Sequence, residues 1–331
     1  MLRFLKFLRR TRFRWLAIAL ATALVIPILV LGIPTHPSLN PQAWAQDNPE
    51  TAQEETFMPP DIEAIIERGE LHVAVLGKDN QPFFQKDSPE TPCTTDPQRA
   101  DELIKMDGET FCGLDIELGK AIADTLGVSV RYDRSAATFN DVVERVFEHK
   151  DDLAFSKISR TMARVKKVSF SKPYVNMSQG LLVNRLELTE QAKGRQIAEI
   201  FRDLEGKVGV IEDSSYVGFT EQKFPDAEVK EYPSWEDVIE AAREGKILAA
   251  YRDELEVKKI IRTYPDTALN FQTIALSDTN DAIAAVIPWD SMHLKELVDQ
   301  YLENNSVDYT ADELLEKYEY MFVTESTTEQ E

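Results

Sequence analysis

The stretch LDIELGKAIADTLGVSVRY, residues 114–132, passes from a helical pattern into a strand pattern through one glycine. Apolar residues recur at helical spacing up to Leu126, and Gly127 follows where a helix C-cap is expected. The segment VSVRY that comes next is typical of a strand. A helix and a strand joined in this way indicate one unit of an α/β fold.

The same alternation extends on both sides of this stretch. Strand patterns occur at LHVAVLG (71–77), LAFS (153–156) and VSFSKPYV (168–175), and TFNDVVERVFEHK (138–150) is typical of a helix capped by Thr138. The β-α-β-α-β order predicts a mostly parallel sheet that is covered by helices.

A second series of strands and helices begins after Gly180. Its expected elements are the strand in LEGKVGVIED (204–213), a helix from Ser214, the strand AEVKEY (227–232), the capped helix SWEDVIEAAREGK (234–246) and the strand in ILAAYRDE (247–254). Residues 270–288 are typical of an extended return, and two terminal helices follow at 291–305 and 311–322. We therefore expect an α/β protein of two lobes, with a ligand cleft between two mainly parallel sheets.

Ligands of such sheets bind outside the carboxyl ends of the strands, and clefts between domains are favoured sites. The expected strand ends that carry polar residues or glycine are Gly77, Ser156, Asp213 and Asp253. We expect the binding site to lie among them.

The chain ends differ from this body. A basic segment, the uncharged run Leu16–Ile33 and the sequence AWA (43–45) predict an export signal (1–45) that is cleaved before Gln46. The apolar run also approaches the length of a membrane span, so an uncleaved anchor stays open. Polar sequences predict a flexible leader at 46–60 and a disordered tail at 324–331.

The net charge of −21 excludes some partners. The first 45 residues contain six basic residues and no acidic one, so the remainder is even more acidic than the whole chain. Such a surface repels phosphate backbones, which argues against a nucleic-acid partner.

Cys93 and Cys112 are the two cysteines of the chain. Export would place them in an oxidising compartment, and we expect them to form one disulfide. Two cysteines without a histidine pair make a poor zinc site, and we find no phosphate-binding glycine loop, so no cofactor is expected.

Arg164, in the segment SRTMARVKKVSFSKPY (159–174), suggests what the cleft binds. Its guanidinium can hold a carboxylate through two hydrogen bonds, and Ser156 and Ser159 add donors from the adjacent strand end. Asp253 could accept from an ammonium group, while a helix N-terminus at Ser214 and Ser215 could donate to a carboxylate. This combination predicts a zwitterionic ligand.

These elements together resemble the family 3 extracellular solute-binding proteins, the amino-acid receptors of ATP-driven importers. The matching segments occur in the family's order and are RGELHVAVLGKDNQPF, FCGLDIELGKAIADTLGVSVRY, DDLAFSKISRTMARVKKVSFSKPYV, LEGKVGVIEDSSY, YPSWEDVIEAAREGKILAAYRDE and ADELLEKYEYMF. The resemblance covers about residues 61–323. It implies the two-lobe periplasmic binding protein type II fold, with lobe 1 at 61–176 and 281–323 and lobe 2 at 177–280.

The resemblance also implies roles for single residues. Arg164 would hold the ligand α-carboxylate with help from Ser159, and Asp253 would bind the α-ammonium. Ser214 and Ser215 occupy the family's two small hydroxyl positions before a helix, and Phe139 the position of an aromatic residue that packs on the ligand.

Three positions depart from the family pattern. Asn80 stands where many relatives have a stacking aromatic residue, Lys157 replaces a small residue beside the carboxylate site, and Asp213 replaces a glycine. Lys157 could pair with an acidic ligand side chain and Asp213 would favour a cationic one, although each could equally face solvent. We expect a polar or charged amino acid as the ligand.

The expected mechanism is closure of the two lobes on the ligand about two crossings, near Val175–Gly180 and Ala275–Asp281. The protein would act as a monomer in the periplasm and deliver the amino acid to an ABC transporter permease in the inner membrane. An insertion at 85–112, closed by the disulfide, would be a rigid flap at the cleft edge, a partner-contact surface or a surface decoration.

Two alternatives belong to other classes. One is a periplasmic enzyme on the same fold, such as a dehydratase, with Glu212 or Glu254 as the general acid. The other is a ligand-sensing module anchored by Leu16–Ile33. No second catalytic motif supports an enzyme, because the four histidines are scattered and neither a Ser/His/Asp order nor a metal-ligand spacing occurs, so a binding protein is expected.

Overall fold

The computed structural model describes residues 58–89, 91–94, 103–106, 108–202, 204–263 and 267–322. The expected signal, most of the leader and the expected tail lie outside these residues. Within them, no helix has both the length and the apolar character that crossing a membrane requires.

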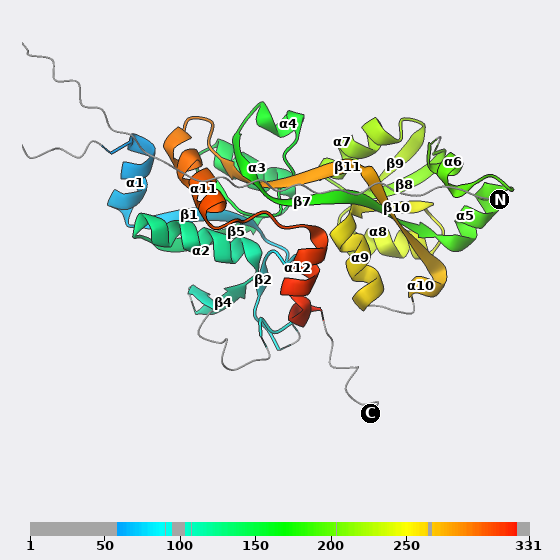
Figure 1. The fold of residues 1–331 in the computed structure, drawn as a ribbon, viewed down its shortest axis with the longest axis horizontal. Coiled ribbons are helices and arrows are strands. Elements are labelled where there is room, and N and C mark those ends of the chain that lie inside the picture. Colours follow the sequence, from blue (N-terminus) through cyan, green and yellow to red (C-terminus); the bar gives the residue numbers. More distant parts are fainter. Residues whose placement is uncertain are drawn as a thin grey trace, which may run out of the picture. The chain divides into compact units, whose positions relative to one another are not determined.

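Two long antiparallel strands, β7 (Ser169–Asn184) and β11 (Phe271–Ile287), run side by side through the fold (Figure 1). Parallel strands extend the sheet on both sides of them, in the order β5-β1-β6-β11-β7-β10-β8-β9. Both strands are long enough to form part of both halves of the sheet. The structure therefore has one continuous eight-stranded sheet where the sequence suggested two.

The first lobe lies on the β5 side of this sheet, and its helices pack on both faces. Its elements are α1 (Pro60–Arg68), β1 (Glu70–Leu76), α2 (Leu114–Leu126), β5 (Ser129–Ala136), α3 (Phe139–Phe147), β6 (Leu153–Ala154), α4 (Met162–Val165), α11 (Met292–Asn304), α12 (Ala311–Lys317) and the short 3₁₀ helix η3 (Glu319–Met321). One hydrophobic core joins all of them except α4, and it includes Val73, Phe155 and Ile283.

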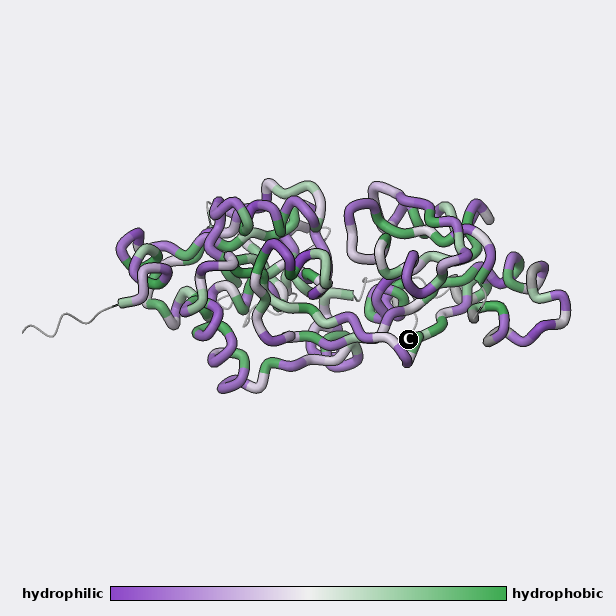
Figure 2. Tube along the Cα trace, turned by 90° about the horizontal axis from the view of Figure 1, so that it is seen from above, coloured by the Kyte–Doolittle hydropathy of each residue, from purple (hydrophilic) through white to green (hydrophobic). Residues whose placement is uncertain are grey.

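The second lobe lies on the β9 side. Its elements are α5 (Arg185–Ala192), α6 (Ile197–Arg202), β8 (Gly206–Ile211), α7 (Ser215–Lys223), β9 (Ala227–Tyr232), α8 (Trp235–Arg243), β10 (Ala249–Asp253), α9 (Glu254–Thr263) and α10 (Thr267–Asn270). Separate apolar clusters cover the two faces of this half of the sheet, one around Tyr251 and one around Trp235. Figure 2 shows hydrophobic segments inside both lobes and hydrophilic ones around them.

Local signals placed most of these elements correctly. Gly127 ends α2 with a left-handed φ of 70°, and Thr138 begins α3 with a capping box to Asp141. The helix expected at 138–150 ends earlier, at Phe147, because the chain turns at His149, whose φ is 54°. Helices α1, α5, α6, α9 and α10 were not predicted.

The insertion after β1 folds into a small sheet of its own. Strands β2 (Gln85–Lys86), β4 (Glu109–Cys112) and β3 (Ile104–Met106) pair antiparallel in that order. The expected disulfide between Cys93 and Cys112 is confirmed, with a Cα–Cα distance of 5.8 Å. It ties the insertion to the residue next to the start of α2.

Candidate ligand site

The segment from β6 into α4 carries four of the expected site residues, Ser156, Lys157, Ser159 and Arg164. Ser156 faces the core, where its Oγ accepts from the backbone N–H of Leu76 at 2.9 Å. Lys157 adopts a left-handed φ of 50° and donates its backbone N–H to Asp115 at 2.8 Å. The chain then reaches α4, which Thr161 caps by accepting from the backbone N–H of Arg164.

Arg164 is a buried cation, with only 7% of its surface exposed. Its Nη1 donates to the backbone oxygen of Ser159 and its Nη2 to Asn140 Oδ1, both at 3.1 Å. No carboxylate of the described residues lies within ion-pair distance of it. Burial lowers the pKa of Arg164 to about 10, and the negative charge of Asp281 partly opposes this shift. A buried guanidinium with free donors is suited to receive an anion.

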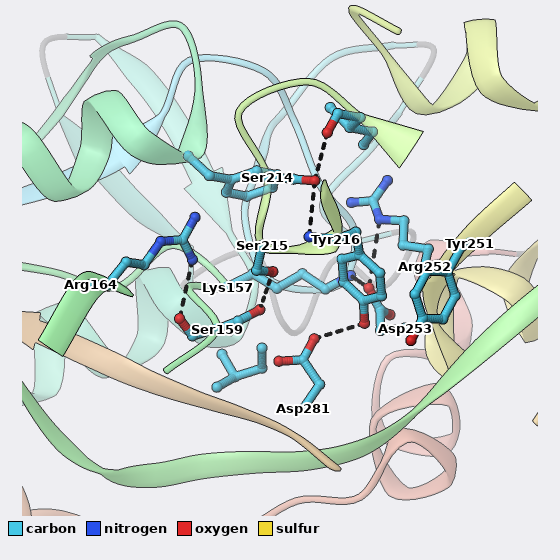
Figure 3. A pocket seen from close by; sticks show the side chains of 13 residues that line it. Lys157, Ser159, Arg164, Ser214, Ser215, Tyr216, Tyr251, Arg252, Asp253 and Asp281 are labelled. Carbon is cyan, nitrogen blue, oxygen red and sulfur yellow. Dashed lines mark hydrogen bonds and ion pairs between the residues drawn. The ribbon is translucent and has the colours of Figure 1, made fainter. Parts of the chain in front are cut away.

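The second lobe presents the N-terminus of α7 to the same place (Figure 3). Ser214 caps this helix by accepting from the backbone N–H of Tyr216, and its hydroxyl donates to the backbone oxygen of Ile211. Ser215 Oγ and Ser159 Oγ share a hydrogen bond of 2.9 Å between the lobes. The helix N-terminus thus lies across from the Arg164 segment.

A buried group of charges, which we call the Lys157 cluster, lies next to this contact. Its members are Lys157, Arg252, Asp253, Glu256 and Lys259, of which Arg252, Asp253, Glu256 and Lys259 come from β10 and α9. Lys157 Nζ lies 2.9 Å from both Asp253 Oδ2 and Glu256 Oε1. Lys259 Nζ lies 2.8 Å from Glu256 Oε2, and Arg252 Nε 3.6 Å from Asp253 Oδ2.

The ion pairs of the Lys157 cluster connect the two lobes. Lys157 comes from the first lobe, and its ammonium also lies 5.0 Å from the centre of the Phe83 ring. Burial opposes ionisation of Glu256, but Lys157 and Lys259 hold the pKa of this carboxyl well below its usual range. Lys157 lines the smaller cavity described below, but it does not face solvent, and its ammonium is already paired with the protein's own carboxylates Asp253 and Glu256.

Asp281 was not predicted as a site residue, although it ends the expected second crossing. It is buried, and Tyr216 donates its hydroxyl to Asp281 Oδ2 at 2.8 Å. The other oxygen, Oδ1, has no hydrogen-bond partner among the described residues. Burial, together with the charge of Asp253, raises the pKa of Asp281 to about 6.

These side chains line two neighbouring cavities. The smaller, about 20 Å³, has room for one water molecule, and the larger is about 440 Å³. Both are lined by Phe139, Ile211 and Arg252. The predicted residues that line the smaller one are Phe139, Lys157, Ser159, Arg164, Ser214, Ser215 and Asp253.

The remaining predicted residues lie elsewhere. Asn80 lines the larger cavity, where its amide can donate to Glu256 Oε1 at 2.9 Å and accept from Arg252 Nη2 at 3.1 Å. Ser156 lines neither cavity. Asp213 is exposed, on a left-handed turn with a φ of 54°.

The described residues contain no group of three or more acidic, histidine or cysteine side chains that could hold a metal ion. The charged and hydroxyl groups that line the smaller cavity are of the kind that can bind and orient a small polar molecule.

Comparison with known proteins agrees with this architecture. A solved structure of the amino acid ABC transporter substrate-binding protein AbpA from Streptococcus pneumoniae, bound to L-arginine, matches with 26% identity and a TM-score of 0.59, over 79% of this chain and 100% of that one. The ancestral amino acid-binding protein AncCDT-1, a precursor of cyclohexadienyl dehydratase, matches with 23% identity and a TM-score of 0.56, over 78% of this chain and 98% of that one. The second likeness shows the fold alone.

A curated relative is ABC transporter arginine-binding protein 1 of Escherichia coli (strain K12), which is 23% identical over 154 residues. The match spans 46% of this chain and 58% of the relative. The sequence profile of the bacterial extracellular solute-binding proteins, family 3, matches residues 95–321. The resemblance noted from the sequence is thereby confirmed, and the chain belongs to this family.

Proposed function

We propose that this protein is the substrate-binding component of an amino-acid ABC importer. The observation that carries the proposal is the buried guanidinium of Arg164, which has no counter-ion among the described residues and lines a cavity between two lobes. A buried charge is costly unless it is paired, so an incoming carboxylate would satisfy Arg164. The family and the amino-acid-binding relatives support the same ligand class.

The lobes supply the two sides of the proposed site. Arg164 and Ser159 come from the first lobe, and Ser214 and Ser215 from the second. The strands β7 and β11 connect the lobes, and their pairing shifts register between Leu276 and Asp281. A hinge at this irregular point would let the lobes close on a ligand that binds the closed form better than the open one.

The ligand side chain would enter the larger cavity, where Phe139 forms part of both walls. Apolar and charged residues share its lining, and Glu212 is exposed at its edge. A polar or charged amino acid fits this mixture. L-arginine is the first candidate, because AbpA binds it and the curated relative is an arginine-binding protein.

We further propose that the protein is exported and that it delivers its ligand to a membrane permease. The signal at 1–45 would be removed before Gln46, and the mature monomer would act in the periplasm with a permease in the inner membrane. The insertion at 85–112 would form a rigid flap at the cleft edge, since Gln85 and Thr91 line the larger cavity. Of the two carboxylates named for an enzyme, Glu254 lines neither of the two cavities, whereas Glu212 lines the larger one and is exposed.

Thermal unfolding of the purified protein, with each of the common amino acids added in turn, tests the proposal. Bound ligand raises the melting temperature by mass action. Arg164→Ala should weaken binding by about a hundredfold or more, since it removes the charged partner of the carboxylate. Arg160→Ala is the matched control, because Arg160 is exposed in the same segment. If no amino acid raises the melting temperature, the proposed function is wrong.

A further inference from the structure

The carboxylate of Asp281 is half satisfied. Tyr216 holds Oδ2, and the nearby Ser159 side chain helps to lower the pKa of Asp281, but the buried Oδ1 forms no hydrogen bond of normal length and geometry with the described residues. Burying an unsatisfied carboxylate oxygen is unfavourable, so such an atom in a cavity wall is suited to accept a hydrogen bond from a ligand. Asp281 lines the same small cavity as Arg164.

Asp253, the expected partner of an ammonium group, is already engaged. Lys157 Nζ lies 2.9 Å from its Oδ2, and the backbone N–H of Glu256 donates to its Oδ1 at 3.1 Å. A ligand ammonium at Asp253 would have to displace Lys157, and Lys157 is also paired with Glu256. That exchange would take apart a buried ion pair before any ligand contact forms.

No such exchange is needed at Asp281. In the view of Figure 3, Arg164 and Asp281 lie on opposite sides of Ser159. They are too far apart to form an ion pair with each other, yet each charge is unmatched by an ion pair among the described residues. The small cavity that they line has room for only one water molecule, so a ligand would enter when the lobes open, and a zwitterion enclosed between the two residues would match both charges at once.

We propose that Asp281 accepts the α-ammonium group of the ligand, while Lys157 neutralises Asp253. This inference rests on the proposed function, because it assigns the second half of the same amino-acid site. The ligand carboxylate would lie at Arg164 and its ammonium at Asp281 Oδ1. Asp253 then acts through Lys157, as part of the contact that holds the lobes together.

The proposed role of Asp281 predicts that ligand affinity depends on pH. Asp281 faces Tyr216 of α7, Tyr251 and Asp253 of β10, and Lys157, Ser159 and Arg164 of the segment after β6. Since burial raises the pKa of Asp281 to about 6, part of the protein carries a neutral Asp281 at pH 5 to 6. An ammonium prefers the ionised form, so affinity should rise as pH rises from 5 to 7.

Calorimetric titration with two probes tests the assignment. The probes are L-arginine, or whichever common amino acid shifts the melting temperature most, and the same molecule without its α-amino group. Asp281→Asn should weaken binding of the amino acid by about tenfold or more and leave the amine-free probe within about twofold. It should also remove the rise in affinity between pH 5 and 7. Asp290→Asn, which is exposed just after the same strand and outside the proposed hinge, is the matched control.

Tyr216→Phe provides a second variant if Asp281→Asn does not fold. It removes a hydrogen bond that lowers the pKa of Asp281, so the pH midpoint of amino-acid affinity should move upward. Equal effects of Asp281→Asn on both probes, or a selective effect of Asp253→Asn instead, would overturn the inference while leaving the proposed function intact. Absence of binding by the wild-type protein would overturn both.

Discussion

Arg164 and Lys157 are two buried cations of one segment, and their surroundings differ. Arg164 is held by neutral oxygens of Ser159 and Asn140, whereas Lys157 is enclosed by the carboxylates of Asp253 and Glu256. Burial lowers the pKa of Arg164 because no ion pair offsets its desolvation. One cation is therefore available for a ligand, and the other is used by the protein itself.

This difference predicts that Arg164 contributes mainly to ligand binding and Lys157 mainly to the stability of the fold. An ion pair that is buried and complete is strongly destabilising to break, because the remaining charge is left without compensation. A buried cation with neutral partners costs folding free energy, and removing it takes away little stabilisation. Substitution of Lys157 should therefore lower the free energy of unfolding strongly, whereas substitution of Arg164 should change it little and weaken ligand binding.

The largest effect is expected for Lys157→Met, which keeps the length of the side chain and removes its charge. Asp253 and Glu256 would lose the cation that lies 2.9 Å from both. The free energy of unfolding should fall by about 3 kcal/mol or more. Urea denaturation followed by circular dichroism measures it.

Lys166→Met is the matched control, since Lys166 is exposed and nearby in the sequence. It should change the free energy of unfolding by less than about 0.5 kcal/mol. A similarly small change for Lys157→Met would show that the cluster does not stabilise the fold.

The sequence placed Arg164 and Ser159 at a cavity as the structure has them, while the role of Arg164 in holding a carboxylate stays a prediction. Arg164 and Ser159 belong to one short segment, and local signals such as the caps at Gly127 and Thr138 placed the flanking elements. The alternation of helices and strands along the chain was predicted in both halves, whereas the order of the strands in one continuous sheet was not. Local patterns were sufficient wherever the interacting residues lie close together in the chain.

The buried ion pairs of Lys157 could not be predicted from local patterns. Lys157 and Glu256 are separated by 99 positions, and their contact depends on how the two lobes meet. Asp281 was missed for a related reason, because its partner Tyr216 is 65 positions away. No local pattern distinguishes a buried carboxylate at a crossing strand from an exposed one.

An effect of intermediate size concerns Asp115, which accepts the backbone N–H of Lys157 and the hydroxyl of Tyr174. Burial raises its pKa from 3.8 to about 7, so between these values the folded state binds more protons than the unfolded state. The free energy of unfolding of the wild type, relative to Asp115→Asn, should therefore rise as pH falls from 8 to 5. The slope should not exceed about 1.4 kcal/mol per pH unit.

Urea denaturation of both proteins across this pH range measures the difference. Asp124→Asn serves as a control, because Asp124 lies exposed on the same helix. A difference between wild type and Asp115→Asn that stays constant from pH 5 to 8 would mean that Asp115 is ionised throughout, and that its contacts with Lys157 and Tyr174 outweigh its burial.

The smallest effect on stability is expected at Arg164. Arg164→Met removes two hydrogen bonds to neutral oxygens, but it also removes the desolvation of a charge that has no ion pair. The two contributions oppose each other, so the free energy of unfolding without ligand should change by less than about 1 kcal/mol. The same variant should no longer be stabilised by an amino acid that stabilises the wild type. A loss of stability as large as that of Lys157→Met would show that Arg164 is a structural cation, and the distinction between the two sites would then disappear.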